Sequence, residues 1–386
     1  MPGVPGLVVA ACRSALGTAH RDDVARAAAQ VSDWSGLAAA AVRHGVLPLV
    51  HAALADAAPL VRPAIPPDVL DELRRRFDEN ALRNIELARH LVQLAQRLAT
   101  EGIAFMPIKG PTLAIAAYGD LALRQFGDLD LVIHRRDLAR VRALLGADGF
   151  VPTNTVPESL DGLAVGTDYH LPLRSPASGI AIEVHWALGR RGLGSLRRPD
   201  WAWSNASTVA LLGRDLPTLD REAQIVYLCA HGAKHDWSQL ARVCDVYAAI
   251  RGPATVDWDR VRTIASRARV GRMLSVGLGL CDALLGADLA ARGWTGSPDP
   301  AARALIAEAH MRCLTDRQLS TGDALRLQLR ARDRMVDRFL LSVDVLSSPH
   351  VADLKTVTLP VGFRALYYLM RPLRLAAKYG RRLIVR

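Results

Sequence analysis

The sequence predicts an α+β protein in which a short α/β unit lies between two helical regions. Before about residue 100 and after about residue 214, apolar residues recur at spacings of three and four, as they do in amphipathic helices. Between these regions, three short apolar segments have the length and pattern of strands. The chain has 386 residues, which is more than one packed core usually holds. More than one domain is therefore expected.

Residues 1–100 are predicted to form an N-terminal helical region. Residues 37–55 form one apolar stretch, and a second stretch opens at Pro66-Pro67-Asp68. Its apolar residues recur at helical spacing and predict one long amphipathic helix. They are Leu70, Leu73, Phe77, Ala81, Ile85, Ala88, Val92 and Ala95. We interpret its polar face as solvated surface; that face carries Arg74, Arg75, Arg76, Glu79 and Arg83.

Residues 101–213 are predicted to form the α/β core. The expected strands are 103–108, 127–133 and 180–186, and the last of these alternates strictly between apolar and polar positions. Helices are expected over 111–118, with a proline in the first turn, and over 137–145. The segment 151–179 contains several Pro and Gly residues and is expected to be a loop or an irregular strand pair.

Residues 214–386 are predicted to form a C-terminal helical domain with a basic tail. The helical period covers 222–250, 257–285, 300–314 and 323–346. The tail, 363–386, is basic and aromatic, so it could contact an anionic surface, either a membrane or nucleic acid. Alternatively, its apolar stripe packs on the preceding helices. We favour packing, because the apolar residues recur at helical spacing; they include Leu366, Leu369 and Leu373.

Composition excludes several classes of protein. Half of the residues are hydrophobic, which excludes wholesale disorder. The 49 basic and 38 acidic residues leave a net charge of +11, so a polyanionic partner is plausible. The five cysteines are far apart and form no C-x-x-C pair, so we expect a reducing, cytoplasmic location without disulfides or structural zinc. No segment has the ~18 apolar residues of a transmembrane helix.

Asp128 and Asp130 form a candidate metal site. They stand two apart on a predicted strand, so both carboxylates point to one face while Leu129 and Leu131 point to the other. Such a pair is costly unless a cation lies between its members, and hard oxygen ligands suit magnesium or manganese. The alternative is that these residues are ordinary strand-end aspartates. Glu183 supplies a third carboxylate on another strand.

Two further groups are candidates for ligand binding. Lys109-Gly110-Pro111-Thr112 lies at a strand-to-helix turn, where free backbone N–H groups favour an anion such as a triphosphate; otherwise Lys109 is an exposed loop residue. His231, Lys234 and His235 either approach the substrate from the helical region or anchor their helix on the core. Gly232 follows His231, which disfavours the zinc-protease motif. His185 could ligate a metal, orient a carboxylate, or be a plain strand residue.

Taken in order, these motifs resemble one known family. They are Lys109-Gly110, Tyr118, Arg124, Asp128-Leu129-Asp130, Glu183-Val184-His185-Trp186 and the segment from His231 to Trp237. The chain is similar, over roughly residues 35–285, to the uncharacterised bacterial nucleotidyltransferase family NTP_transf_5, placed in the DNA polymerase β-like superfamily. The resemblance implies a small mixed sheet, Asp128 and Asp130 as paired metal-binding aspartates, and Glu183 as the third carboxylate. Gly110-Pro111 replaces the usual Gly-Ser or Gly-Gly signature.

The expected function is therefore magnesium- or manganese-dependent nucleotidyl transfer. A nucleoside monophosphate would pass from a nucleoside triphosphate (NTP) to a hydroxyl or phosphate of an acceptor, with release of pyrophosphate. The acceptor could be a small molecule, peptide, protein or RNA. The residues expected to bind the nucleotide are Lys109, Gly110, Thr112, Arg124, His185, His231, Lys234 and His235. Two alternatives stay open: a toxin-like transferase that modifies tRNA or other RNA, and a non-catalytic nucleotide-binding regulatory protein.

Overall fold

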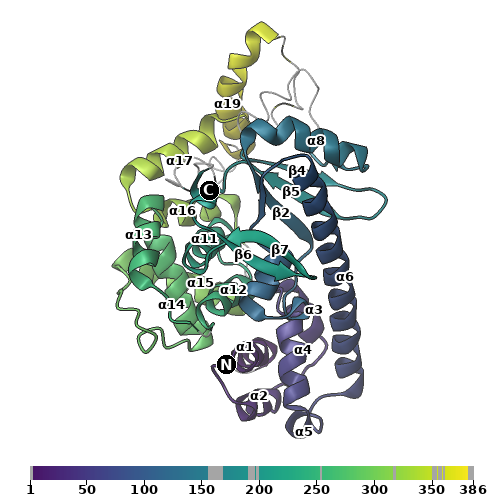
Figure 1. Cartoon of the computed structure of the whole chain (residues 1–386). Helices are drawn as coiled ribbons and strands as arrows, with labels where there is room; N and C mark the ends of the chain where they lie inside the picture. Colours follow the sequence, from purple (N-terminus) through teal and green to yellow (C-terminus); the bar gives the residue numbers. More distant parts are fainter. Residues whose placement is uncertain are drawn as a thin grey trace.

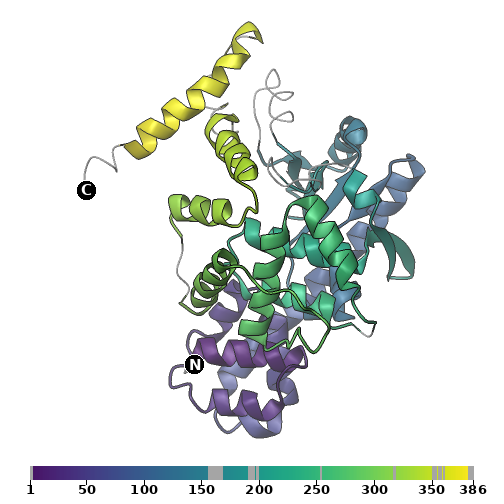
Figure 2. The ribbon, with the colours of Figure 1, turned by 90° about the vertical axis from the view of Figure 1, so that its left-hand side faces the viewer.

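The fold is a five-stranded sheet between two groups of helices (Figures 1 and 2). The computed structural model describes residues 3–154, 168–189, 196, 200–252, 254–315, 319–349, 354, 359 and 361–380. Part of the segment 151–179, which is predicted to be a loop or irregular strand pair, lies outside the described residues (155–167), as does the end of the basic tail, 381–386.

The sheet is mixed, as expected. Its strands lie in the order β1 (Phe105–Pro107), β2 (Asp128–Ile133), β5 (Ala181–His185), β4 (His170–Arg174) and β3 (Val151–Pro152). The central pair, β2 and β5, is parallel, and the other pairs are antiparallel. All three predicted strands are confirmed, and β3 and β4 form the irregular pair. The parallel pair matters for function, because it sets the two acid-bearing strands side by side.

One face of the sheet is covered by α6 (Pro67–Thr100) and α8 (Leu138–Ala147). Leu129 and Leu131 pack there against apolar side chains of α6 such as Leu91, and each fully buried leucine contributes roughly 1.5 to 3 kcal/mol. The long predicted helix is confirmed. Its first half packs elsewhere, on α4 (Leu47–Asp56), where the rings of His51 and Phe77 stack at 4.3 Å.

The other face of the sheet meets a core shared by the N-terminal and C-terminal helices. Met106 and Val132 contribute to this core from the sheet. The helices that build it are α1 (Val4–Ala15), α2 (Arg21–Ala28), α3 (Leu37–Arg43), α4, α5 (Ala58–Val61), α11 (Arg221–Lys234), α12 (Leu240–Ile250), α13 (Trp258–Ala268), α14 (Gly271–Leu285) and α15 (Pro300–Thr315). Arg13 of α1 donates to the carbonyl of Leu284 at 2.8 Å. The N-terminal helices are therefore packed against the helices of the C-terminal region.

Several predicted helical stretches are broken in two. The stretch 37–55 divides into α3 and α4 at Gly45, whose φ of 68° is left-handed. The stretch 222–250 divides into α11 and α12, because Asp236 and Trp237 also have positive φ. A side chain on Gly232 would overlap the Trp237 ring, so that glycine allows the break to pack. The helical period continues across each break because both halves bury apolar residues in the same core.

Other described elements were not individually predicted, although α1, α2 and α5 lie within the predicted N-terminal helical region. These are α1, α2, α5, α10 (Asp200–Trp203), the 3₁₀ turns 121–123 and 135–137, and a hairpin of β6 (Ala206–Leu211) and β7 (Arg214–Leu219). Leu212 and Gly213 both have positive φ at the hairpin turn, the geometry that tight hairpins prefer. Five of the six residues of β6 are exposed or half-buried, so the strand carries little of the usual apolar alternation.

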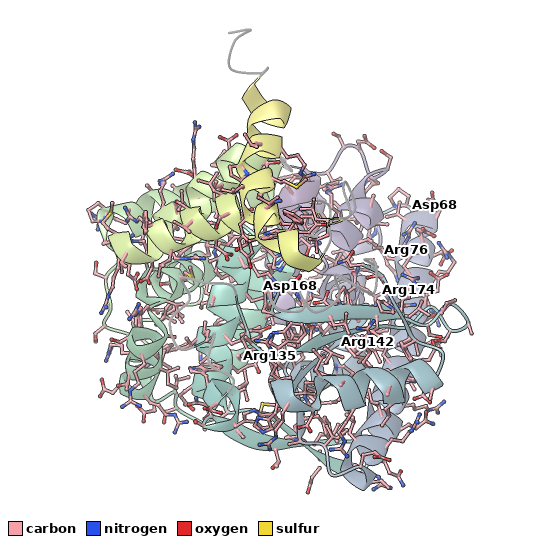
Figure 3. All side chains as sticks on the ribbon, turned by 90° about the horizontal axis from the view of Figure 1, so that it is seen from above. Asp68, Arg76, Arg135, Arg142, Asp168 and Arg174 are labelled. Carbon is pink, nitrogen blue, oxygen red and sulfur yellow. The ribbon has the colours of Figure 1, made fainter. Side chains whose placement is uncertain are left out.

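The C-terminal helices lie at the top of the molecule (Figures 1 and 3). They are α16 (Thr321–Arg330), α17 (Met335–Ser347) and, after a 3₁₀ segment over 361–366, α19 (Tyr367–Gly380). The expected packing of Leu366, Leu369 and Leu373 is wrong, since all three side chains are exposed. Tyr367 is buried against Leu354 instead. Among the described helices, none is long and apolar enough to cross a membrane.

Candidate functional site

A cavity of about 810 Å³ opens beside the ends of β2 and β5. Its walls come from the sheet, the middle of α6, the turn after β1, and the facing ends of α11 and α12. The predicted site residues that line it are Lys109, Gly110, Arg124, Asp128, Asp130, Glu183, His185, His231, Lys234 and His235. The structure thus brings ten of the eleven predicted residues to one cavity.

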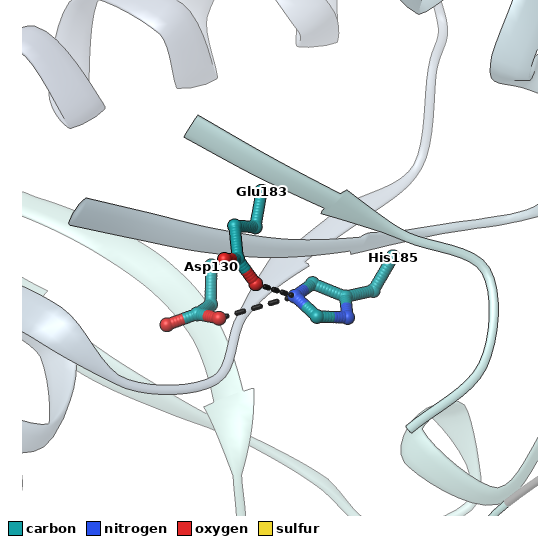
Figure 4. A group of neighbouring side chains, drawn as sticks. All are labelled: Asp130, Glu183 and His185. Carbon is teal, nitrogen blue, oxygen red and sulfur yellow. Dashed lines mark hydrogen bonds and ion pairs between the residues drawn. The ribbon is translucent and has the colours of Figure 1, made fainter. Parts of the chain in front are cut away.

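The acidic wall follows from the strand register. Parallel pairing places Asp130 opposite Glu183 and Val132 opposite His185, so alternation along both strands points the polar side chains to one face. The Nε2 of His185 lies 3.1 Å from Oδ1 of Asp130 and 3.3 Å from Oε2 of Glu183 (Figure 4). One donor atom from each of these three residues lies within 4.8 Å of the others. This group could hold a metal ion.

The Lys109 ammonium belongs to the same group. The backbone N–H of Ile108 donates to the carbonyl of Asp130 at 3.2 Å, which extends the β1–β2 pairing and brings the next residue beside Asp130. The Nζ of Lys109 then lies 2.9 Å from Oδ2 of Asp130. Gly110 turns the chain with φ of 60°, and a Cβ there would come within 3.4 Å of the Asp128 carbonyl.

The two aspartates differ electrostatically. Burial would raise the pKa of Asp130, but Lys109 and His185 hold this pKa well below its usual range. The pKa of Lys109 is raised, because attraction to Asp130 outweighs burial. The pKa of Asp128 is also raised, first by burial and then by repulsion from Asp130. An added cation would therefore lower the electrostatic cost of ionising Asp128, whereas the charge of Asp130 is already stabilised by Lys109 and His185.

Glu183 and His185 hold each other in place. A hydrogen bond from His185 lowers the pKa of Glu183. Burial opposes the charge of His185, but the hydrogen bonds to Asp130 and Glu183 outweigh it and raise the His185 pKa. The Glu183 side chain is 32% exposed, whereas that of Asp130 is 3% exposed. Glu183 is therefore the carboxylate that an entering substrate can reach more readily.

The opposite wall is built by α11 and the start of α12. The rings of His231 and His235 lie 4.6 Å apart, one turn apart on the helix. Burial lowers the pKa of His231 well below its usual value and lowers the pKa of His235 to about 3. Both imidazoles are thus neutral at pH 7. Positive charge on this wall comes from Arg242 and from Lys234, whose Nζ lies 5.1 Å from the Tyr169 ring centroid.

Arg124 connects the sheet region to α12. Its Nε and Nη2 each donate to a different carboxylate oxygen of Asp245 at 2.9 Å, the bidentate geometry that makes such pairs strong. The Tyr118 hydroxyl donates to the same carboxylate at 2.8 Å. The third nitrogen, Nη1, is buried and has no hydrogen-bond partner among the described residues. The residue also lines the cavity, and its guanidinium carbon lies 5.8 Å from the Phe126 ring centroid.

Thr112 is the predicted residue that the structure does not place on the cavity wall. Its side chain is fully buried, and its hydroxyl donates to the carbonyl of Lys109 at 2.9 Å. Thr112 therefore stabilises the turn that carries Lys109.

Sequence reasoning missed several other lining residues. Arg76, Glu79 and Arg83 of α6, interpreted above as solvated surface, border the cavity. Asp245 was also missed, although a carboxylate between apolar neighbours in a helix is a recognisable signal of a buried partner. Tyr227 lies on the α11 wall near Lys109.

The fold and site define the class of protein. A mixed sheet whose central parallel strands carry paired aspartates and a third carboxylate, beside a cavity lined by both acidic and basic side chains, is the arrangement expected of a nucleotidyltransferase core. A family model described as "uncharacterised nucleotidyltransferase" (NTP_transf_5) matches residues 30–286. The chain belongs to this family.

Two other comparisons add little detail. A solved structure described as an antigenic nucleotidyltransferase-like protein from Paracoccidioides brasiliensis is 17% identical, with a TM-score of 0.32; the match covers 52% of this chain and 93% of that one. No curated protein matches the chain.

Proposed function

We propose that the protein is a magnesium-dependent nucleotidyltransferase, with manganese as the alternative ion. It moves a nucleoside monophosphate from an NTP to a hydroxyl or phosphate of an acceptor and releases pyrophosphate. The observation that carries this proposal is the cavity itself. One wall holds Asp128, Asp130 and Glu183, and the facing wall holds Lys234 and Arg242, so cation and polyphosphate each have a complementary surface.

The donor set fits a divalent ion. Two carboxylates and an imidazole converge within 4.8 Å, and Asp128 adds a carboxylate whose raised pKa favours an extra cation. Carboxylate oxygens suit magnesium and manganese. The bound ion would neutralise charge that develops on the transferring phosphoryl group.

Chain residues would orient the reactants and accept the proton. The triphosphate would lie along the cavity side that carries Lys234 and Arg242, with its α-phosphorus toward the carboxylates. The acceptor oxygen attacks that phosphorus, and the bond from phosphorus to the bridging oxygen of the leaving pyrophosphate breaks. When the acceptor is a hydroxyl, its proton passes to the Glu183 carboxylate and then to water. His185 holds Glu183 for this step through the 3.3 Å contact.

Binding and turnover can be tested together. The full chain is melted with each of the four common NTPs, with and without magnesium, and pyrophosphate release is followed with cell extract as the acceptor source. A ligand at about one hundred times its Kd stabilises the folded state by about 2.7 kcal/mol. We expect a magnesium-dependent rise in melting temperature and pyrophosphate release that Asp130→Asn abolishes. No shift with any NTP would contradict the proposal.

A second candidate is an RNA-modifying transferase. It is favoured by the net charge of +11 and by Arg76 and Arg83 at the cavity rim. Labelled NTP incubated with total RNA, and separately with protein-only extract, distinguishes the two acceptor classes. The third alternative, a non-catalytic nucleotide-binding protein, predicts the thermal shift without pyrophosphate release.

A further inference from the structure

The C-terminal helices α17 and α19 expose an unusual number of large apolar side chains. On α17, these side chains are Met335, Val336, Phe339, Leu340, Val343 and Leu346. On the 3₁₀ segment and α19, they are Phe363, Leu366, Tyr368, Leu369 and Leu373. Phe339 is 66% exposed and Leu373 is 71% exposed. Soluble surfaces rarely gather so many apolar groups without a partner. We call these eleven side chains the apolar C-terminal surface.

The helix α17 buries acidic side chains on its inner face and exposes apolar side chains on its outer face. Its inward face carries two buried carboxylates, Asp337 and Asp344, on either side of Leu341. Arg269, the residue that caps the C-terminus of α13, pairs with Oδ1 of Asp337 at 3.2 Å, which offsets part of the cost of burying this carboxylate. Met335 and Phe339 point outward instead. The inner face of α17 is thus held by polar contacts. The outer, apolar face is exposed in the described part of the chain.

The two helices are joined to each other. The Nε of Arg371 on α19 donates to the carbonyl of Val345 on α17 at 3.0 Å. On α19 and the turn before it, the exposed residues Phe363, Leu366, Leu369 and Leu373 recur at spacings of three and four, so they share one side of the helix. Figure 2 shows α19 projecting from the rest of the molecule.

Charge distinguishes among the partners that could cover this surface. Residues 354–386 contain eight Lys and Arg residues and no Asp or Glu. RNA would match the charge but would leave Phe and Leu side chains in water. A second copy of the chain would cover the apolar groups but would bring two strongly basic segments together. An anionic lipid surface satisfies both requirements.

We propose that the apolar C-terminal surface binds the face of an anionic lipid bilayer. The apolar side chains enter the boundary between headgroups and acyl chains, and the basic residues contact the lipid phosphates. The proposed association is peripheral, at the surface of the bilayer. This inference does not depend on the nucleotidyltransferase reaction.

Vesicle sedimentation of the full chain tests the proposal. The probes are vesicles of phosphatidylcholine alone and of phosphatidylcholine mixed with phosphatidylglycerol. We expect binding to the mixed vesicles that weakens as salt rises, and little binding to the neutral ones. The triple variant Phe339→Ser, Leu369→Ser, Leu373→Ser should lose roughly tenfold in partition coefficient for each side chain changed. Leu82→Ser on α6, also exposed, is the matched control and should bind as the parent does.

The remaining outcomes overturn the proposal. Vesicle binding that the triple variant retains in full, or that total RNA displaces completely, would show a purely electrostatic or nucleic-acid surface. A concentration-dependent dimer that the variant abolishes, without vesicle binding by the parent, would identify a second copy as the partner. The variant's thermal unfolding and circular dichroism establish that it is folded, which is expected because all three side chains are exposed.

Discussion

The Lys109 ammonium lies 2.9 Å from the Asp130 carboxylate. This ion pair is almost completely buried, so each charge depends on the other. Without an ion or a nucleotide, Lys109 supplies much of the positive charge that Asp130 requires. Under the proposed function, an NTP bound in the cavity would compete with Asp130 for this ammonium through its β- and γ-phosphates.

Replacing Lys109 should therefore have two separable effects. Lys109→Met leaves Asp130 buried with one cation fewer, which costs about 3 to 5 kcal/mol of unfolding free energy. Magnesium should restore part of this loss by replacing the missing charge. Urea unfolding with and without magnesium measures both the loss of unfolding free energy and its recovery. Lys234→Met, in the same cavity, is the control and should show no magnesium-dependent recovery. The role assigned to Lys109 is wrong if the two variants behave alike.

The two aspartates should respond oppositely in metal-free protein. Asp128→Asn should leave stability unchanged or raise it at neutral pH, because the raised pKa of Asp128 means that its charged form is disfavoured in the fold. Asp130→Asn should destabilise, because Lys109 and His185 lose their partner. Both should abolish transfer. Denaturant titrations in chelator and pyrophosphate assays check this, and equal stability changes would argue against the electrostatic difference.

Glu183→Gln separates proton transfer from ion binding. If Glu183 accepts the acceptor proton, kcat should fall by about a hundredfold to ten-thousandfold while NTP affinity stays close to that of the parent. Magnesium titration of the rate provides the second readout. A rise in the magnesium concentration needed for half-maximal rate would show instead that Glu183 acts mainly as an ion ligand.

The Arg124–Asp245 pair should contribute strongly to stability. Asp245→Asn leaves the buried guanidinium and the Tyr118 hydroxyl with a weaker acceptor, and we expect a loss of about 3 kcal/mol. Asp259→Asn breaks the exposed pair with Arg262 on α13 and should cost less than about 1 kcal/mol. Chemical unfolding compares the two variants. Similar small losses would mean that the pair is not required to join α12 to the sheet region.

His235 should make the folded protein sensitive to acid. Its pKa of about 3 in the fold lies below the usual value of about 6.5, so the unfolded chain binds more protons between these two values. Stability should therefore fall as pH drops from about 6.5 toward 3, with a slope of at most about 1.4 kcal/mol per pH unit from this group. In His235→Gln the slope of unfolding free energy against pH should be smaller. An unchanged slope would contradict the buried, neutral state.

Local pattern was enough to find the acidic strands and the long helix. Alternation with a period of two places Asp128 and Asp130 on one face of any strand that contains them, whatever surrounds it. The apolar spacing along 67–100 likewise predicts a long helix, because its face must be buried somewhere. The broken helices show the limit of this reasoning. Trp237 adopts a left-handed conformation that its residue type does not signal.

The sequence by itself determined which residues carry charge and to which side of their own element they point. Only the tertiary structure decided their partners. Lys109 meets Asp130 because of the β1–β2 register, and Arg124 meets Asp245, 121 residues away, because α12 packs beside the sheet. The exposure of Leu373 also depends on tertiary packing. Such pairings depend on long-range packing and desolvation, which no local period encodes, because the free energy of a contact exists only once both partners are brought together.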